Sequence, residues 1–148
     1  MKIRISLFVS LFILTSFSLT VAQTVSDTIY VASWNMENLF DAIDDEDKRD
    51  EEFLPNGKKE WTQEKIDSKM VNQSKVIQWM NDGEGPDLLG IQEVEHKHLI
   101  DTMLKRHFKN INYKVAYQET LDKRGIDNGL IYNADKFEVL NINPIEVE

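Results

Sequence analysis

Two apolar segments, separated by a stretch with helical spacing, constrain the fold of this chain more than any other feature of its sequence. "DTIYVASWNM" (27–36) alternates apolar and polar side chains as a strand does, and "DLLGIQEVE" (87–95) is almost continuously apolar, as in a strand covered on both faces. Between them, from Thr62 to about Asn81, apolar residues recur at helical spacing until "NDGEGP" ends the pattern. This order predicts a strand–helix–strand unit whose two strands are neighbours and end at one rim of a sheet.

The rest of the chain is predicted to add one helix and three strands. The helix is expected at about residues 96–108, and the strands at 113–120, 130–133 and 137–142. Residues 41–61 are acidic, have no sustained period and contain the turn signal "PNG". Their carboxylates lack EF-hand spacing, so we expect a solvated loop. The order predicts an α+β fold, a sheet with helices packed on one face.

The first 22 residues have the layout of a secretory signal peptide. A positive start precedes an apolar run from Ile5 to about Leu19, and small residues follow. A retained transmembrane anchor is the alternative, but the run is shorter than the roughly 20 residues that a span needs, and Ser and Thr interrupt it. We therefore expect cleavage after residues 1–22, one domain over 23–148, export to the periplasm or the extracellular space, and no stable membrane anchor.

Charge and cysteine content narrow the function classes. The chain has no cysteine, so an exported form gains no disulfide and must rely on packing or a bound metal. Its formal net charge is −9, whereas proteins that bind nucleic acid by neutralising phosphates are usually basic. This balance opposes tight, unaided DNA binding, but it allows a site where a divalent cation meets a phosphate.

Polar side chains follow the two most apolar strands at the point where each ends. Glu37 and Asn35 lie at the end of the first strand, and Glu93 lies at the end of the second. In open α/β sheets ligands bind beyond the carboxyl ends of strands, and carboxylate and amide oxygens suit a hard cation such as Mg²⁺ or Mn²⁺. The alternative is that these residues are turn formers or helix caps.

Two further groups of residues carry chemistry. Arg124 and Gly125 lie in a loop before a strand, where glycine allows close backbone approach and a guanidinium can hold a phosphate; a hairpin turn with a solvated arginine is the alternative. His96 and His98 are two apart in the second helix and are expected to point to different faces, which disfavours zinc. With His107 they are expected at the surface.

Three motifs in this chain resemble the endonuclease/exonuclease/phosphatase superfamily: "SWNMENLFD" (33–41), "DLLGIQEVE" (87–95) and "RGIDNGLIY" (124–132). Each alone is weak, but they occur in the family's order over most of residues 23–148. The resemblance implies a four-layer α/β/β/α sandwich with a metal-dependent site at the sheet rim. This chain would supply the N-terminal half, a mixed sheet with helices on one face.

The resemblance also assigns roles to particular residues. Asn35 matches the catalytic amide that touches phosphate, and Glu93 matches the principal metal carboxylate of the catalytic centre. Glu37 lies where several relatives have a second acidic residue near the metal, Mg²⁺ or Mn²⁺. Arg124 and Asp127 match the loop that approaches the substrate phosphate. The next two residues, Asn-Gly, depart from the small apolar residues expected there.

A larger departure concerns the second half of the family pattern. The resemblance implies a Gly-Asp-x-Asn turn and a late Asp-His pair that supplies the general base, and this sequence ends at Glu148 without them. We therefore expect a metal-dependent phosphodiester or phosphomonoester hydrolase that is incomplete in this chain. The alternative is a catalytically inactive fragment, or a remnant that binds metal or phosphate.

The expected partners follow from this interpretation. The substrate would be a phosphate ester, either nucleic acid or a small phosphodiester, and the sequence does not identify which. Half of a two-sheet sandwich also exposes a sheet face, and a large exposed apolar patch favours association. We therefore expect self-association through the uncovered face.

Overall fold

The computed structural model describes residues 28–145, so the expected signal peptide at 1–22 lies outside the described residues. Along the chain the elements are β1 (Val31–Leu39), η1 (Glu51–Phe53), α1 (Gln63–Trp79), η2 (Asn81–Gly83), β2 (Leu88–Val94), α2 (Lys97–His107), β3 (Tyr113–Tyr117) and β4 (Asp127–Asn133). Within residues 28–145 no helix is both long enough and apolar enough to cross a membrane.

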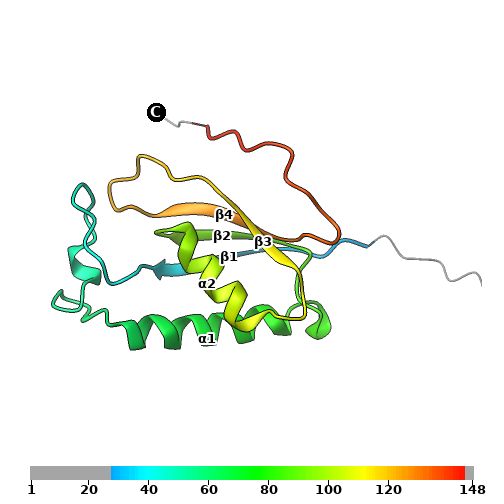
Figure 1. The fold of residues 1–148 in the computed structure, drawn as a ribbon, viewed down its shortest axis with the longest axis horizontal. Coiled ribbons are helices and arrows are strands. Elements are labelled where there is room, and N and C mark those ends of the chain that lie inside the picture. The colour runs from blue at the N-terminus through cyan, green and yellow to red at the C-terminus, as the bar shows by residue number, and fades with distance from the viewer. Residues whose placement is uncertain (1–27, 146–148) are drawn as a thin grey trace, which may run out of the picture.

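The four strands form one mixed sheet in the order β1-β2-β4-β3. β1 and β2 are parallel neighbours, whereas β4 pairs antiparallel with both β2 and β3. Figure 1 shows α1 and α2 on the same face of this sheet. The prediction of an α+β fold with a mixed sheet and helices on one face is confirmed. A sheet with one helical layer is half of an α/β/β/α sandwich.

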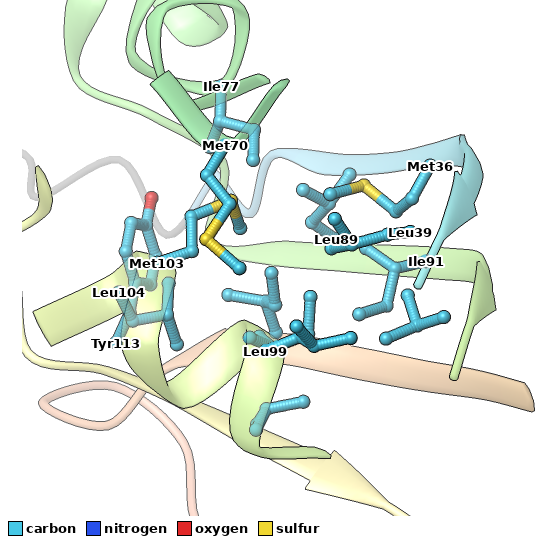
Figure 2. Packing of buried hydrophobic residues seen from close by; sticks show 14 of the residues in the cluster. Met36, Leu39, Met70, Ile77, Leu89, Ile91, Leu99, Met103, Leu104 and Tyr113 are labelled. Carbon is cyan, nitrogen blue, oxygen red and sulfur yellow. The ribbon is translucent and has the colours of Figure 1, made fainter. Parts of the chain in front are cut away.

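The core lies between the sheet and the two helices. Ile66, Met70 and Ile77 recur along one stripe of α1 and are at most 2% exposed. Figure 2 shows Met70 and Ile77 of α1 facing a layer formed by the sheet residues Met36, Leu39, Leu89 and Ile91 and by Leu99, Met103 and Leu104 of α2. Close packing of this layer fixes where β1 and β2 end relative to α1.

Two details of this packing differ from the sequence prediction. The helical spacing predicts that Val76 lies on the apolar face of this helix with Ile66, Met70 and Ile77, but Val76 is 38% exposed, because it lies about 100° around the helix from the buried Ile77. β2 was expected to be covered on both faces, yet its burial alternates: Leu89 and Ile91 are fully buried, while Leu88 and Gln92 are partly exposed. The helices cover only one face of the strand.

The strand predicted at 137–142 is also absent. This segment has no strand pairing; it follows a turn in which the Phe137 N–H donates to the Asn133 carbonyl at 3.0 Å. Figure 1 shows the C-terminal segment running over the sheet face opposite the helices. A groove of about 960 Å³ lies between this segment and β3 and β4. Because the segment crosses a face rather than following a sheet edge, its backbone meets no strand to pair with.

A buried carboxylate fixes the starts of β1 and β2 at the opposite end of the sheet from the predicted site. Asp87, 4% exposed, accepts hydrogen bonds from the Tyr30 N–H at 2.8 Å and from the Lys136 ammonium at 2.6 Å. The Lys136 hydrogen bond, followed by that of Tyr30, lowers the pKa of Asp87. Asp87 therefore stays ionised and joins three segments of the chain.

Candidate metal centre

The parallel ladder between β1 and β2 is interrupted at the predicted site. Its register runs to Asn35 opposite Gln92 and resumes at Leu39 opposite Val94, so that residues 36–38 of β1 face the single residue Glu93. This is a bulge at the carboxyl ends of both strands, and we refer to residues 35–38 and Glu93 as the bulge.

The bulge contains three residues in the left-handed region of backbone space. The φ angles of Glu37, Asn38 and Glu93 are 56°, 60° and 58°, and none of these residues is glycine. Such a conformation costs roughly 1–3 kcal/mol for a non-glycine residue and clusters at functional sites, where surrounding contacts maintain it. The strain lies at three positions of the interrupted β1–β2 ladder, two of which carry carboxylates.

Hydrogen bonds tie the side chains of Asn35 and Glu93 to the backbone of the bulge; that Asn35, Glu37 and Glu93 form one site stays a prediction. The Glu37 N–H donates to Asn35 Oδ1 at 2.7 Å, and the Asn38 N–H donates to Glu93 Oε2 at 3.1 Å. Glu37 is exposed, while Asn35 and Glu93 are partly buried. Two carboxylates and one amide therefore share one rim of the sheet.

Helix α1 holds the bulge through two side-chain donors. Gln73 Nε2 donates to the Met36 carbonyl at 2.8 Å, and Lys69 Nζ donates to the Glu37 carbonyl at 2.9 Å. Gln73 is buried, so its contact is sheltered from water. The helix thus satisfies two consecutive carbonyls that the interrupted ladder leaves without strand partners.

Lys69 is a charged member of the site that the sequence analysis missed. Burial lowers its pKa, while the nearby charges of Glu37 and Glu93 oppose that shift. The ammonium therefore lies within electrostatic reach of both carboxylates. In the sequence Lys69 precedes Met70, an apolar residue of the helical pattern, but that pattern alone does not distinguish a lysine at the site from a solvated lysine.

The donor set at the bulge fits a hard divalent cation. Glu37 and Glu93 offer carboxylate oxygens and Asn35 an amide oxygen, which are the ligand types that Mg²⁺ and Mn²⁺ prefer. Glu93 uses Oε2 for the Asn38 N–H, and a carboxylate has further lone pairs for a cation. The strained backbone orients these groups before any ligand arrives.

The structure places Arg124, on the loop between β3 and β4, and Asp127, the first residue of β4, at the same end of the sheet as the bulge. Arg124 is exposed, and its loop is tied to the acidic loop by hydrogen bonds from Lys48 Nζ to the Asp122 carbonyl at 2.9 Å and from the Arg49 N–H to the Lys123 carbonyl at 2.8 Å. Figure 1 shows both loops at the end of the sheet toward which β1 runs.

Asp127 lies in a different environment from Arg124. It opens β4, is 6% exposed, and accepts hydrogen bonds from the N–H and the hydroxyl of Thr120 and from the Tyr117 hydroxyl. Burial, and next the charge of Asp127, raise the pKa of Tyr117, which keeps its hydroxyl a donor. In this structure Asp127 shapes the loop that carries Arg124; its direct contact with substrate stays a prediction.

The prediction that His96 and His98 point to different faces is wrong. Their rings are stacked, with centroids 5.5 Å apart and planes at 29°. His96 is not helical: it is the N-cap of α2, with φ −134° and ψ 145°, so the helical angle of about 100° per residue does not separate the two rings. Both histidines turn toward the acidic loop.

Comparison with known proteins agrees with this fold. Residues 30–148 match the model of the Endonuclease/Exonuclease/phosphatase family. No curated protein and no solved structure gives a match. The chain belongs to the endonuclease/exonuclease/phosphatase family, as its three motifs predicted. The family has a phosphoesterase- and nuclease-type fold, acts on phosphoester substrates, and generally depends on a divalent metal.

Proposed function

We propose that this chain is an exported phosphoesterase that uses Mg²⁺ or Mn²⁺ to hydrolyse a phosphodiester or a phosphomonoester. The observation that carries the proposal is the strained bulge, where Glu93 and Glu37 meet Asn35 on one sheet rim. Family membership supports the class of reaction. Export rests on the signal-peptide layout of residues 1–22.

Glu93 and Glu37 would hold the cation. The cation would polarise a phosphoryl oxygen and stabilise the negative charge that develops on the phosphoryl group during hydrolysis. Glu93 is the principal ligand, because its hydrogen bond to the Asn38 N–H fixes the carboxylate at the bulge. Lys69 holds the Glu37 carbonyl and so keeps the second carboxylate at the rim.

Asn35 and Arg124 would bind the substrate phosphate. Asn35 Oδ1 accepts the Glu37 N–H, which leaves the amide NH₂ group free to donate to a phosphate oxygen. Arg124 brings an exposed guanidinium whose paired N–H groups match two phosphate oxygens. Asp127 acts on Arg124 indirectly, by fixing the loop through Thr120.

The alternative is a chain that binds metal or phosphate without turnover. The positions of the histidines favour this alternative. His96 pairs with Asp45 and His98 pairs with Asp41 in the acidic loop, so neither histidine is assigned as a general base at the bulge. Hydrolysis requires an activated water as well as charge stabilisation.

Hydrolysis assays on the purified chain distinguish the two functions. Bis-p-nitrophenyl phosphate, p-nitrophenyl phosphate and plasmid DNA test the diester, the monoester and the nuclease forms of the proposal in turn. Turnover that requires Mg²⁺ or Mn²⁺ and disappears with EDTA supports the phosphoesterase. If the chain binds the cation but hydrolyses none of these three substrates, the result supports the alternative of a chain that binds metal or phosphate without turnover.

A further inference from the structure

A second group of metal-ligand side chains lies just beyond the bulge and shares no residue with it. Asp41, Glu95 and His96 each place one ligand atom within 4.8 Å of the others. The Glu95 N–H donates to the Leu39 carbonyl at 3.0 Å, and the Asp41 N–H donates to Glu95 Oε2 at 2.7 Å. The backbone thus continues the β1–β2 pairing outward and fixes the two carboxylates beside each other.

Glu95 is a buried carboxylate that forms no ion pair among the described residues. Its side chain is 1% exposed, and within residues 28–145 no lysine, arginine or histidine lies within ion-pair distance of it. Its side-chain hydrogen bond comes from the Asp41 N–H. Burial raises the pKa of Glu95 to about 7, whereas the charge of His96 lowers it. A buried carboxylate of this kind is neutral, paired or bound to a metal.

Carboxylates face both ring nitrogens of His96: its Nε2 lies 3.1 Å from Asp45 Oδ2 and its Nδ1 lies 3.3 Å from Glu119 Oε1. A ligating histidine typically donates its other ring N–H to a carboxylate, which fixes the ring. A cation bound to one nitrogen of His96 would replace the carboxylate there, and the other nitrogen would keep its partner. His98 Nε2, 3.3 Å from Asp41 Oδ2, supports the first carboxylate in the same way.

Asp50 fixes the backbone of Asp45, the residue whose carboxylate lies beside His96 Nε2. Asp50 is 1% exposed; its Oδ2 accepts the Asp45 N–H at 3.0 Å, and its Oδ1 is buried with no hydrogen-bond partner among the described residues. A hollow of about 520 Å³ opens to the surface beside this group and is lined by Asp41, Asp45 and His96 among others.

We propose that Asp41, Glu95 and His96 bind one first-row divalent transition ion, Zn²⁺ or Mn²⁺. Two carboxylate oxygens and one imidazole nitrogen form the three-ligand set typical of such ions, whereas Mg²⁺ prefers oxygen ligands alone. The ion joins the exit of β1 and the acidic loop to the junction between β2 and α2. It would stabilise a chain that has no cysteine for a disulfide.

Titration calorimetry with ZnCl₂ on the full chain, in the presence of millimolar Mg²⁺, tests the site. We expect one equivalent to bind, a weakening of at least tenfold in His96→Ala and in Asp41→Asn, and an unchanged affinity in the matched control His107→Ala. The same titration in Glu93→Gln should still give one equivalent, which separates this site from the bulge. Absence of binding, or unchanged affinity in His96→Ala, would overturn the proposal.

Histidine-ring NMR on the wild-type chain keeps the test valid if a variant fails to fold. Addition of one equivalent of Zn²⁺ should shift the ring resonances of His96 and leave those of His107 in place. Shifts at His107 alone, or at no histidine, would contradict the site. Neither readout depends on phosphoester turnover, so the proposal stands or falls independently of the hydrolase function.

Discussion

Asp127→Asn tests whether this carboxylate is a structural acceptor or a substrate ligand. Asp127 is 6% exposed and receives three hydrogen bonds, two from Thr120 and one from Tyr117. An amide has one acceptor oxygen, which can take the two Thr120 bonds at Oδ1, and it presents an NH₂ donor to the Tyr117 hydroxyl at Oδ2. A hydrogen bond to a charged group contributes about 1.5–3 kcal/mol and one to a neutral group about 1 kcal/mol, so each Thr120 bond weakens by roughly 1 kcal/mol and the Tyr117 bond to this side chain is lost. The expected loss of unfolding free energy is about 2–3 kcal/mol, or a fall in Tm of about 8 °C.

Thermal unfolding followed by circular dichroism measures this loss. Asp122→Asn in the same loop is the matched control, because Asp122 is exposed and its carboxylate accepts a single hydrogen bond among the described residues, from the Arg124 N–H at 2.8 Å. The structural role predicts a large fall in Tm for Asp127→Asn, a small one for the control, and a KM within about twofold of wild type wherever the variant is folded. An unchanged Tm together with a tenfold rise in KM would refute the reasoning and make Asp127 a substrate ligand.

Three further predictions follow from the described contacts. Lys69→Met removes a positive charge beside Glu37 and Glu93, so calorimetry should show Mg²⁺ binding several-fold more tightly. The control Lys65→Met, on the exposed face of α1, should leave the Mg²⁺ affinity unchanged. Weaker Mg²⁺ binding in Lys69→Met would mean that the hydrogen bond from Lys69 to the Glu37 carbonyl matters more than the charge of Lys69. Because the folded state holds the pKa of Asp87 below its unfolded value of about 3.9, its contribution to stability is complete above that pH and is lost as the pH falls through the folded pKa. Urea unfolding between about pH 5 and pH 2 should therefore show a smaller acid-induced loss in Asp87→Asn than in wild type, and parallel curves would contradict it. Sedimentation velocity should show concentration-dependent self-association through the sheet face opposite the helices, and a monodisperse monomer would count against it.

The sequence was sufficient to predict the order of elements and the meeting of the strand ends. Apolar periodicity predicted both helices, and the order strand–helix–strand predicted the pairing of β1 with β2. The periodic signal is clear in these elements because each of them buries one continuous stripe or face. It failed at 137–142, where the segment crosses the open face of the sheet without pairing along an edge, and Val139, Leu140 and Ile142 are 40%, 86% and 42% exposed. Alternation of apolar residues predicts a strand only where one side of the segment is buried, and here neither side is.

The sequence suggested the residues of the candidate site, which stay a prediction, but not the geometry of the bulge that carries them. Asn35, Glu37 and Glu93 were identified from their place after apolar strands, whereas the left-handed conformations that join them come from tertiary contacts with Gln73 and Lys69. Such long-range contacts leave no periodic signal in the sequence. The stacked histidines were missed for a related reason: the expected helical geometry does not extend to an N-cap residue.

The most direct test of the account is the Mg²⁺-dependent hydrolysis of bis-p-nitrophenyl phosphate by Glu93→Gln. Glu84→Gln is the matched control, because Glu84 is exposed and lies before the start of β2, at the other end of the sheet from the bulge. The account predicts that kcat/KM falls by about 10²-fold or more in Glu93→Gln, as when a charge-stabilising group is lost, and stays at the wild-type value in Glu84→Gln. Equal turnover in Glu93→Gln and wild type, or no turnover by the wild-type chain with any divalent cation, would contradict it.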